Sequence, residues 1–219
     1  MRIEKPGVVT AALGVSGLAA LVLTGLTACG SGGGASPAAP SAQLVASCTA
    51  SITQASPNQA VQFTCSASGG NGTFTFAWDF GDGRTSTQQS PTHAFETIGN
   101  FAVKVTVGSG GQTGSSSLTI RVAVNQSLVV GPDGGRATLT FATAGAVRIR
   151  VSLSATSDLS PYGGLEGPGY SDYFPTQATA SGGTNTAELS LTAAGLFTLT
   201  VFEGNNLGGA VNVKVEAVS

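Results

Sequence analysis

Apolar side chains occupy every second position along most of this chain. In the clearest stretch Phe74, Phe76, Trp78 and Phe80 alternate with Thr75, Ala77 and Asp79. A β-strand points successive side chains to opposite faces, so this stretch predicts one strand with an aromatic inner face. The stretch holds the only tryptophan and runs into Gly81-Asp82-Gly83. That triplet predicts a turn, because glycine reaches positive φ and aspartate bonds its local backbone.

The same alternation continues on both sides of the aromatic stretch. It gives three further apolar faces: Val61/Phe63/Cys65, Phe101/Val103/Val105/Val107 and Leu118/Ile120/Val122/Val124. A first strand is expected near Val45 to Thr53, and Gly69–Gly72 and Gly108–Gly111 are typical of hairpin turns. Short strands at this spacing predict a β-sandwich over residues 44–124.

Beyond Val124 the period-2 pattern restarts. Its apolar faces are Ala137/Leu139/Phe141, Val147/Ile149/Val151/Leu153, Leu189/Leu191, Phe197/Leu199/Val201 and Val211/Val213/Val215. They predict a second small β-sandwich over residues 125–219, joined to the first by a short semi-rigid segment, Ala123 to Ser127. The expected fold class is therefore all-β, with two consecutive β-sandwiches.

Composition supports this prediction and narrows the partners. Of 219 residues, 32 are glycine and only 9% are charged, and no amphipathic helix is evident after the N-terminus. Short Val, Thr and Phe runs broken by glycine and proline are typical of strands. The net charge is −2 and there is no basic stripe, so nucleic acid is not an expected partner.

The N-terminus has the features of an export signal. Arg2 and Lys5 precede an uncharged run from Val8 to Ala28 that is long enough to enter a bilayer. The run ends in Leu26-Thr27-Ala28-Cys29, which resembles the lipobox of bacterial lipoproteins. The resemblance implies cleavage before Cys29, a diacylglycerol on its sulfur and an acylated amine. An uncleaved transmembrane helix is the alternative.

A flexible tether is expected after the lipid-bearing cysteine. Gly30 to Ser41 consists of Gly, Ser, Ala and Pro and cannot build a core. Residues 1–28 are thus predicted to be a signal peptide and residues 29–43 a lipid-anchored tether. The predicted location is the extracytoplasmic side of the cell envelope, at the outer membrane if the host has one, because Gly30 rather than Asp follows the cysteine.

The first predicted sandwich resembles the polycystic kidney disease (PKD) repeat domain. The resemblance rests on Trp78–Gly83, on Ser90–Phe95 and on Gly99–Val107. The departures are mild, with Ser90 in place of Asn, Phe95 and Phe101 in place of Tyr, and Ile98 in place of Pro. The family implies an immunoglobulin-like β-sandwich that serves outside cells as a spacer or as a contact module for protein or carbohydrate.

Each polar residue of this motif has two interpretations. Asp79 and Asp82 either cap the turn or bind Ca²⁺, but two carboxylates fall short of the six to eight oxygens that calcium takes. His93 is the only histidine. It either makes a structural hydrogen bond, as its place in the family motif implies, or acts as a base, but no catalytic partner set is identifiable.

The three cysteines divide between lipid and disulfide. With Cys29 assigned to lipid, Cys48 and Cys65 remain, both with the parity of inward-facing positions. In an exported protein the two are expected to form a disulfide, which stabilises a chain with a loop of this length by ~3 kcal/mol. Two free thiols or a metal-binding pair are the alternatives.

Ser154 to Thr184 is predicted to be a long loop in the second sandwich. It carries all three tyrosines, Tyr162, Tyr170 and Tyr173, together with Asp158, Glu166, Asp172 and Phe174. Long loops are often functional and tyrosine offers contact area at low entropy cost, so these tyrosines are candidate ligand contacts. The alternatives are that the tyrosines pack the loop onto its own sandwich, with a short strand hidden inside it, or that the acids form a glycosidase pair.

The function expected from the sequence is non-catalytic. Thr192–Val201 and Gly208–Val215 are similar, weakly, to bacterial pre-peptidase C-terminal domains. No catalytic residue, cofactor or metal is expected. The protein is predicted to be an envelope lipoprotein that presents β-sandwiches to a protein or a glycan. The alternatives are a structural spacer or assembly partner of an envelope complex, and a hydrolase within residues 125–219.

Overall fold

A computed structural model describes residues 42–155, 161–174, 184–203 and 208–218. Cys29, the predicted signal peptide, most of the tether and Asp158 lie outside these residues. All the regular elements in the described ranges are strands, which confirms the all-β prediction. Within the same ranges, no helix has the length and apolar character to cross a bilayer.

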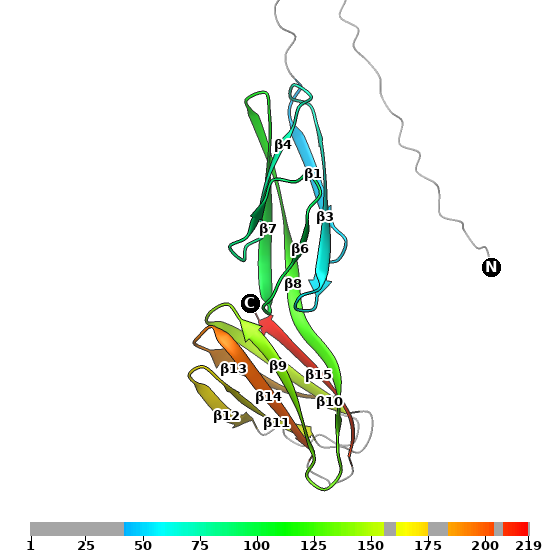
Figure 1. The fold of residues 1–219 in the computed structure, drawn as a ribbon, viewed down its shortest axis with the longest axis vertical. Helices are drawn as coiled ribbons and strands as arrows, with labels where there is room; N and C mark the ends of the chain where they lie inside the picture. Colours follow the sequence, from blue (N-terminus) through cyan, green and yellow to red (C-terminus); the bar gives the residue numbers. More distant parts are fainter. Residues whose placement is uncertain (1–41, 156–160, 175–183, 204–207, 219) are drawn as a thin grey trace, which may run out of the picture. The chain divides into compact units, whose positions relative to one another are not determined.

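The first sandwich contains eight strands in two layers (Figure 1). They are β1 (Val45–Ala50), β2 (Gln54–Ala55), β3 (Ala60–Ser68), β4 (Thr75–Asp79), β5 (Thr85–Ser86), β6 (Thr92–Ala94), β7 (Gly99–Ser109) and β8 (Gln112–Val130). One layer has the strand order β1-β3-β6. The other runs β8-β7-β4-β5, with β2 parallel to β8.

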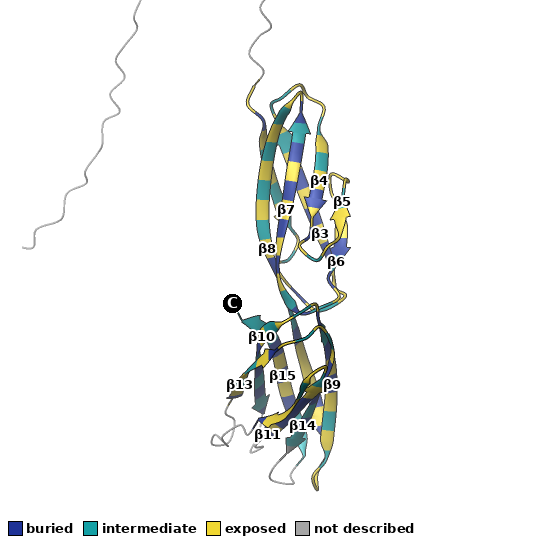
Figure 2. Ribbon diagram, turned by 90° about the vertical axis from the view of Figure 1, so that its left-hand side faces the viewer, coloured by how far each residue is buried: buried dark blue, intermediate teal, exposed yellow. Residues whose placement is uncertain are grey.

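Aromatic rings fill the space between these layers. Trp78 is 1% exposed, and its ring centroid lies 5.4 Å from that of Phe63. Other ring contacts of this core join Phe80 to His93 at 4.0 Å and Phe95 to Phe101 at 4.5 Å. The alternation predicted from sequence is visible in Figure 2 as bands of buried and exposed residues along β7.

Cys48 and Cys65 form the predicted disulfide. They are directly opposite each other in the antiparallel pairing of β1 with β3. The bond therefore fixes the register of β1, the first described strand of the chain. This confirms the pairing expected from the parity of the two cysteines.

β8 is a single strand of 19 residues that takes part in both sandwiches. Its first part pairs with β7 up to Val122, and its second part pairs with β15 from Ala123 onward. The side chain of Val122 belongs to the first hydrophobic core and that of Val124 to the second. The predicted joint, Ala123 to Ser127, thus lies inside a hydrogen-bonded strand.

The second sandwich is built from β8 and seven further strands. They are β9 (Arg136–Thr143), β10 (Val147–Ala155), β11 (Pro161–Gly167), β12 (Tyr170–Phe174), β13 (Thr184–Leu191), β14 (Gly195–Glu203) and β15 (Gly209–Val218). One layer has the order β13-β10-β15-β8 and the other β12-β11-β14-β9. The core between them is mostly Val, Leu and Ile.

The expected loop from Ser154 to Thr184 contains two strands, β11 and β12, so that expectation was wrong. The alternation was hidden because Gly163, Gly164 and Gly167 have no side chains to show it. Aromatic rings from neighbouring strands cover these glycines. A Cβ added to any of the three would lie within 3 Å of the ring of Phe174, Tyr173 or Phe197, respectively. Rings on the next strand therefore replace the missing side chains of β11.

Candidate functional site

Exposed aromatic side chains gather on the outer face of the β12-β11-β14-β9 sheet. The rings of Tyr162 and Phe202 stack with centroids 5.1 Å apart and an angle of 14° between their planes. The ring of Tyr173 lies 6.1 Å from that of Phe202. Tyr162 is 39% and Tyr173 64% exposed. We call Tyr162, Tyr173, Phe202 and the neighbouring Arg136 the aromatic face.

Strand register brings these four residues together from distant parts of the sequence. Tyr162 on β11 is opposite Phe202 on β14, and Phe202 is opposite Arg136 on β9. Directly opposite residues on one face of a sheet have Cβ atoms about 5 Å apart, so their side chains meet. Cζ of Arg136 lies 5.5 Å from the centre of the Phe202 ring, at the distance of a cation–π contact.

Tyr173 lies across the neighbouring strand. It is the cross-strand partner of Gly164, and a Cβ on that glycine would meet both Cδ1 and Cε1 of the tyrosine at 2.9 Å. These distances place the ring against the bare backbone of β11. The Cδ1–Cε1 edge of the ring therefore lies over Gly164, and a large part of the side chain stays open to solvent. The glycine is what allows this position, because any other residue would push the ring away.

Polar side chains border the tyrosine ring. Thr200 is the partner of Gly164 on β14, and Glu166 is the next outward-facing residue of β11. Ser171 pairs with Glu166 from the other side. Together with Tyr173, Phe202 and Arg136, these residues surround a hollow of about 170 Å³, which Asp172 also lines. The site thus combines one open ring with hydroxyl and carboxylate groups at its edge.

The three tyrosines of the predicted contact segment are separated by the fold. Tyr162 and Tyr173 belong to the aromatic face, but Tyr170 is half-buried and packs against the second core. Burial raises the pKa of the Tyr170 hydroxyl, because the phenolate loses solvation, and the charge of Asp172 raises it further. Tyr170 and Tyr173 are three positions apart, an odd spacing that predicts opposite faces once the segment is known to be a strand.

Two residues of the aromatic face were not identified from the sequence. Phe202 alternates in step with the outward-facing Thr198 and Thr200, and this spacing could have identified it as an outward-facing residue. Arg136 had none, since its contact with Phe202 depends on the pairing of β9 with β14.

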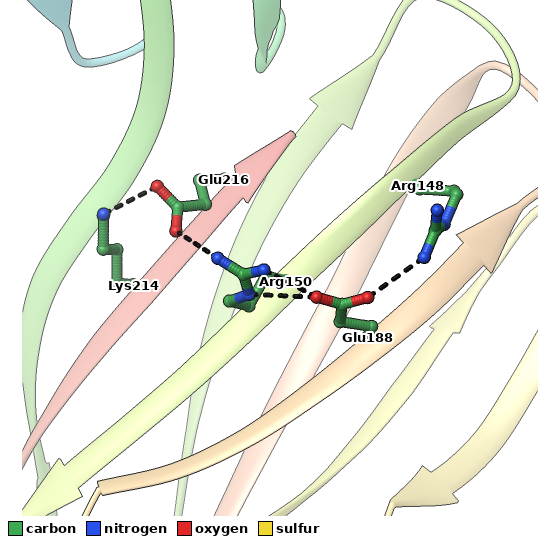
Figure 3. Close-up of polar contacts among 5 residues, drawn as sticks. All are labelled: Arg148, Arg150, Glu188, Lys214 and Glu216. Carbon is green, nitrogen blue, oxygen red and sulfur yellow. Dashed lines mark hydrogen bonds and ion pairs between the residues drawn. The ribbon is translucent and has the colours of Figure 1, made fainter. Parts of the chain in front are cut away.

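The other outer face of this sandwich carries a network of paired charges (Figure 3). Arg148 and Arg150 on β10 donate hydrogen bonds of 3.0 Å and 2.6 Å to the two carboxylate oxygens of Glu188 on β13. Glu216 on β15 lies 3.7 Å from Arg150 and 2.6 Å from Lys214. We call these five residues the charge ladder.

The charges of the ladder are paired with one another, three cations with two acids. The hydrogen bond that Glu188 accepts from Arg150, and the attraction of that positive charge, hold the pKa of the Glu188 carboxyl below its ordinary value of 4.5. The same contacts raise the pKa of the Arg150 guanidinium. Both acids are each shared between two cations. A charged ligand would have to displace these internal partners, so the aromatic face is the stronger candidate.

The motif residues of the first sandwich make local bonds. Asp79 Oδ1 accepts a hydrogen bond of 2.9 Å from the backbone N–H of Gly81. Asp82 Oδ1 accepts one of 3.0 Å from the backbone N–H of Arg84, and its Oδ2 lies 2.7 Å from Nε2 of His93. Gly81 and Gly83, on either side of Asp82, have φ of 78° and 85° and form the turn.

These contacts describe a turn tied to a core histidine. Both Asp82 oxygens are engaged inside the protein, and His93 is 9% exposed. Trp78 Nε1 donates a 2.8 Å hydrogen bond to the backbone oxygen of Gln88. In the described part of the chain no three His, Cys, Asp or Glu residues are grouped to hold a metal ion.

Residues 38–124 match the family model of the PKD domain, which confirms the resemblance drawn from the motif. None of the curated proteins compared with the chain matches it.

Among solved structures, the chain is similar to carbohydrate-binding modules of the β-sandwich superfamily. This match has 15% identity and a TM-score of 0.39, and it covers 81% of this chain and 98% of that one. The chain is also similar to the pre-peptidase C-terminal domain of a Bacillus anthracis collagenase, at 22% identity, TM-score 0.34 and coverages of 43% and 87%.

A third similar structure is a periplasmic inhibitor of g-type lysozyme from Salmonella Typhimurium. Its identity is 19% and its TM-score 0.34, with 44% of this chain and 91% of that chain covered. At such identities and TM-scores the matches support no conclusion about function. The functional argument therefore rests on the geometry of the two outer faces.

Proposed function

We propose that the protein is an exported, lipid-anchored and non-catalytic binding protein that contacts its ligand through the aromatic face. The observation that carries the proposal is the pair of exposed tyrosines, Tyr162 and Tyr173, gathered around the half-buried ring of Phe202 on an open sheet face. Aromatic rings bring a large apolar area, and tyrosine adds a hydroxyl that remains useful at a wet interface.

The surroundings of the cluster support a binding role. The rings of the aromatic face are not part of the second core, which consists mostly of Val, Leu and Ile. They belong to the residues of each strand that alternate with the core residues and face outward. Folding therefore does not require aromatic residues at these outer positions.

The location follows from the N-terminal residues. In this proposal the chain is cleaved before Cys29, lipid on that cysteine holds it at the envelope, and the Gly/Ser-rich segment lets the sandwiches stand away from the bilayer. Cys29 lies outside the described residues. The mass of the N-terminal peptide of the protein purified from membranes tests this part, since an unacylated or uncleaved peptide contradicts it.

Binding through the aromatic face is tested with the full-length chain extracted in mild detergent. Its sedimentation with cell-envelope material from which the lipids have been extracted, so that lipid on Cys29 cannot contribute, is compared with that of the double variant Tyr162→Ala/Tyr173→Ala. We expect the variant to lose most of its binding, by roughly tenfold or more in affinity, because two contact rings are removed. The control is Tyr170→Phe, which changes the third tyrosine of the same segment on the opposite parity and should bind like the native chain.

The result also separates binding from a purely structural role. Melting temperatures of all three proteins show whether each is folded. Envelope binding that stays native in a folded double variant would overturn the proposal. The protein would then act as a spacer or assembly partner, whose function depends on the length of the chain and not on this surface.

A further inference from the structure

We infer that the ligand of the aromatic face is an uncharged carbohydrate chain, with one sugar ring stacked on Tyr173. The inference deepens the proposed function and rests on it. Three observations support it: the position of the Tyr173 ring, the hydroxyl-rich border around it and the balance of charge on the face.

The Tyr173 ring offers a flat surface to solvent. Its contact with Gly164 fixes the ring against the backbone of β11, and the side chain is nevertheless 64% exposed. An aromatic ring has a negative face, and the C–H bonds on the flat side of a sugar ring present weakly positive hydrogens. An exposed ring that the sheet holds in place therefore suits a sugar.

The border of the ring supplies partners for sugar hydroxyls. Thr200 and Glu166 adjoin Gly164 across and along the sheet, and Ser171 lies beside Glu166. Hydroxyl groups donate and accept, and a carboxylate accepts, so together these side chains complement the hydroxyls of a sugar. A few polar groups around an apolar surface are the usual design of a small-ligand site.

Charge on this face favours a neutral ligand. The charged side chains that line the hollow are one cation, Arg136, and two anions, Glu166 and Asp172. Arg136 is held beside the Phe202 ring by a cation–π contact. A polyanion would meet the Glu166 carboxylate, and a basic peptide would meet the Arg136 guanidinium. An uncharged polymer meets neither repulsion.

The shape of the face disfavours a protein ligand. Protein hot spots place large side chains in pockets that are fully closed to water. The hollow here measures only about 170 Å³ and is bordered mainly by polar residues. A sugar ring lying on one aromatic residue needs no deeper pocket.

Affinity electrophoresis of the full-length chain in detergent tests the inference. The gels contain one of four neutral polysaccharides, namely β-glucan, xylan, galactomannan or glycol chitin. We expect at least one to retard the protein, and Tyr173→Ala to weaken that retardation roughly tenfold. Tyr173→Phe and Tyr173→Trp should keep it, because both keep a ring that can stack.

Gly164→Ala tests the position of the ring without changing any proposed contact. The added methyl would meet the ring at 2.9 Å and tilt it away from the sheet, so affinity should fall as it does in Tyr173→Ala. Leu196→Ala, at an exposed apolar position on the same sheet face, is the matched control and should bind normally. Melting curves show that each variant is folded.

Four outcomes overturn the inference. No retardation by any neutral polysaccharide, with envelope binding still lost in Tyr162→Ala/Tyr173→Ala, means that the proposed function holds but the ligand is of another class, such as a protein. Stronger, salt-sensitive retardation by polygalacturonate means a charged glycan. Native affinity in a folded Gly164→Ala variant means that binding does not depend on the position of the Tyr173 ring on Gly164. Release of reducing ends from a polysaccharide means a hydrolase.

Discussion

The two sandwiches use aromatic residues in opposite ways. In the first, Trp78 and Phe80 face inward and contact other rings, including that of His93. In the second, Tyr162 and Tyr173 face outward over a core that is mostly aliphatic. Both sets lie on or beside strands with the same alternating pattern. Aromatic residues therefore indicate stability or binding only once the face they occupy is known.

Polar groups follow the same division. In the first sandwich the indole N–H of Trp78 and the carboxylate of Asp82 have partners inside the protein, the Gln88 backbone and His93. Buried polar groups need such partners, because an unpaired one costs free energy. In the second sandwich the tyrosine hydroxyls of the aromatic face are at an exposed surface, where water or a ligand can pair with them.

The largest effect is expected at Trp78. Trp78→Ala removes the largest fully buried side chain and leaves a cavity, so the free energy of unfolding should fall by about 3–5 kcal/mol. Chemical denaturation measures the change. Tyr173→Ala, tested in parallel, should change that free energy by less than about 0.5 kcal/mol because its side chain is largely exposed. Similar losses in the two variants would remove the distinction between the sandwiches.

A smaller effect is expected at Asp82. Asp82→Ala removes the partner of His93 and the cap on the Arg84 N–H, so the free energy of unfolding should fall by about 1–3 kcal/mol. Glu96→Gln, which alters an exposed ion pair with Arg84 nearby, serves as the control and should be nearly neutral. Denaturation with and without Ca²⁺ also tests the alternative reading of the turn. Strong stabilisation of the native chain by calcium, lost in Asp82→Ala, would favour a metal site.

The smallest effect is expected in the charge ladder. Glu188→Gln should lower the melting temperature slightly at neutral pH, because these ion pairs are exposed. The pKa of Glu188 is below 4.5 in the folded protein, so its stabilisation is present above that pH and is lost as the pH falls through the lower folded value.

Melting curves of native chain and Glu188→Gln at several pH values test this. The difference between the two should close in acid and shrink in high salt. A difference that persists well below pH 4.5 would mean that Glu188 acts through packing and not through its charge. Polysaccharide binding should be unaffected throughout, since the ladder lies on the other outer face.

Much of the fold could be predicted because β-strands repeat every two residues. Alternation located the strands around Trp78, and parity paired Cys48 with Cys65. The method failed at β11 because a glycine gives no signal of which face it occupies. The partner ring that covers Gly164 comes from β12 and is visible only when the strands are paired.

The candidate site was harder to predict than the fold. The segment with the tyrosines was identified, and two of the three lie on the aromatic face. Phe202 and Arg136 were missed because they come together through register, and a single sequence does not record register. The direction of each tyrosine became clear only when the segment proved to be a strand.

Gly164 has a consequence for how this surface changes over many generations. It offers no side chain to a ligand, yet the position of the Tyr173 ring depends on its being a glycine. Its φ is not among the positive values, so other residues fit its backbone. Substitutions of Gly164 would leave the fold intact, and selection would act on them only through their effect on the binding surface. Specificity could therefore drift through a residue that offers the ligand no side chain.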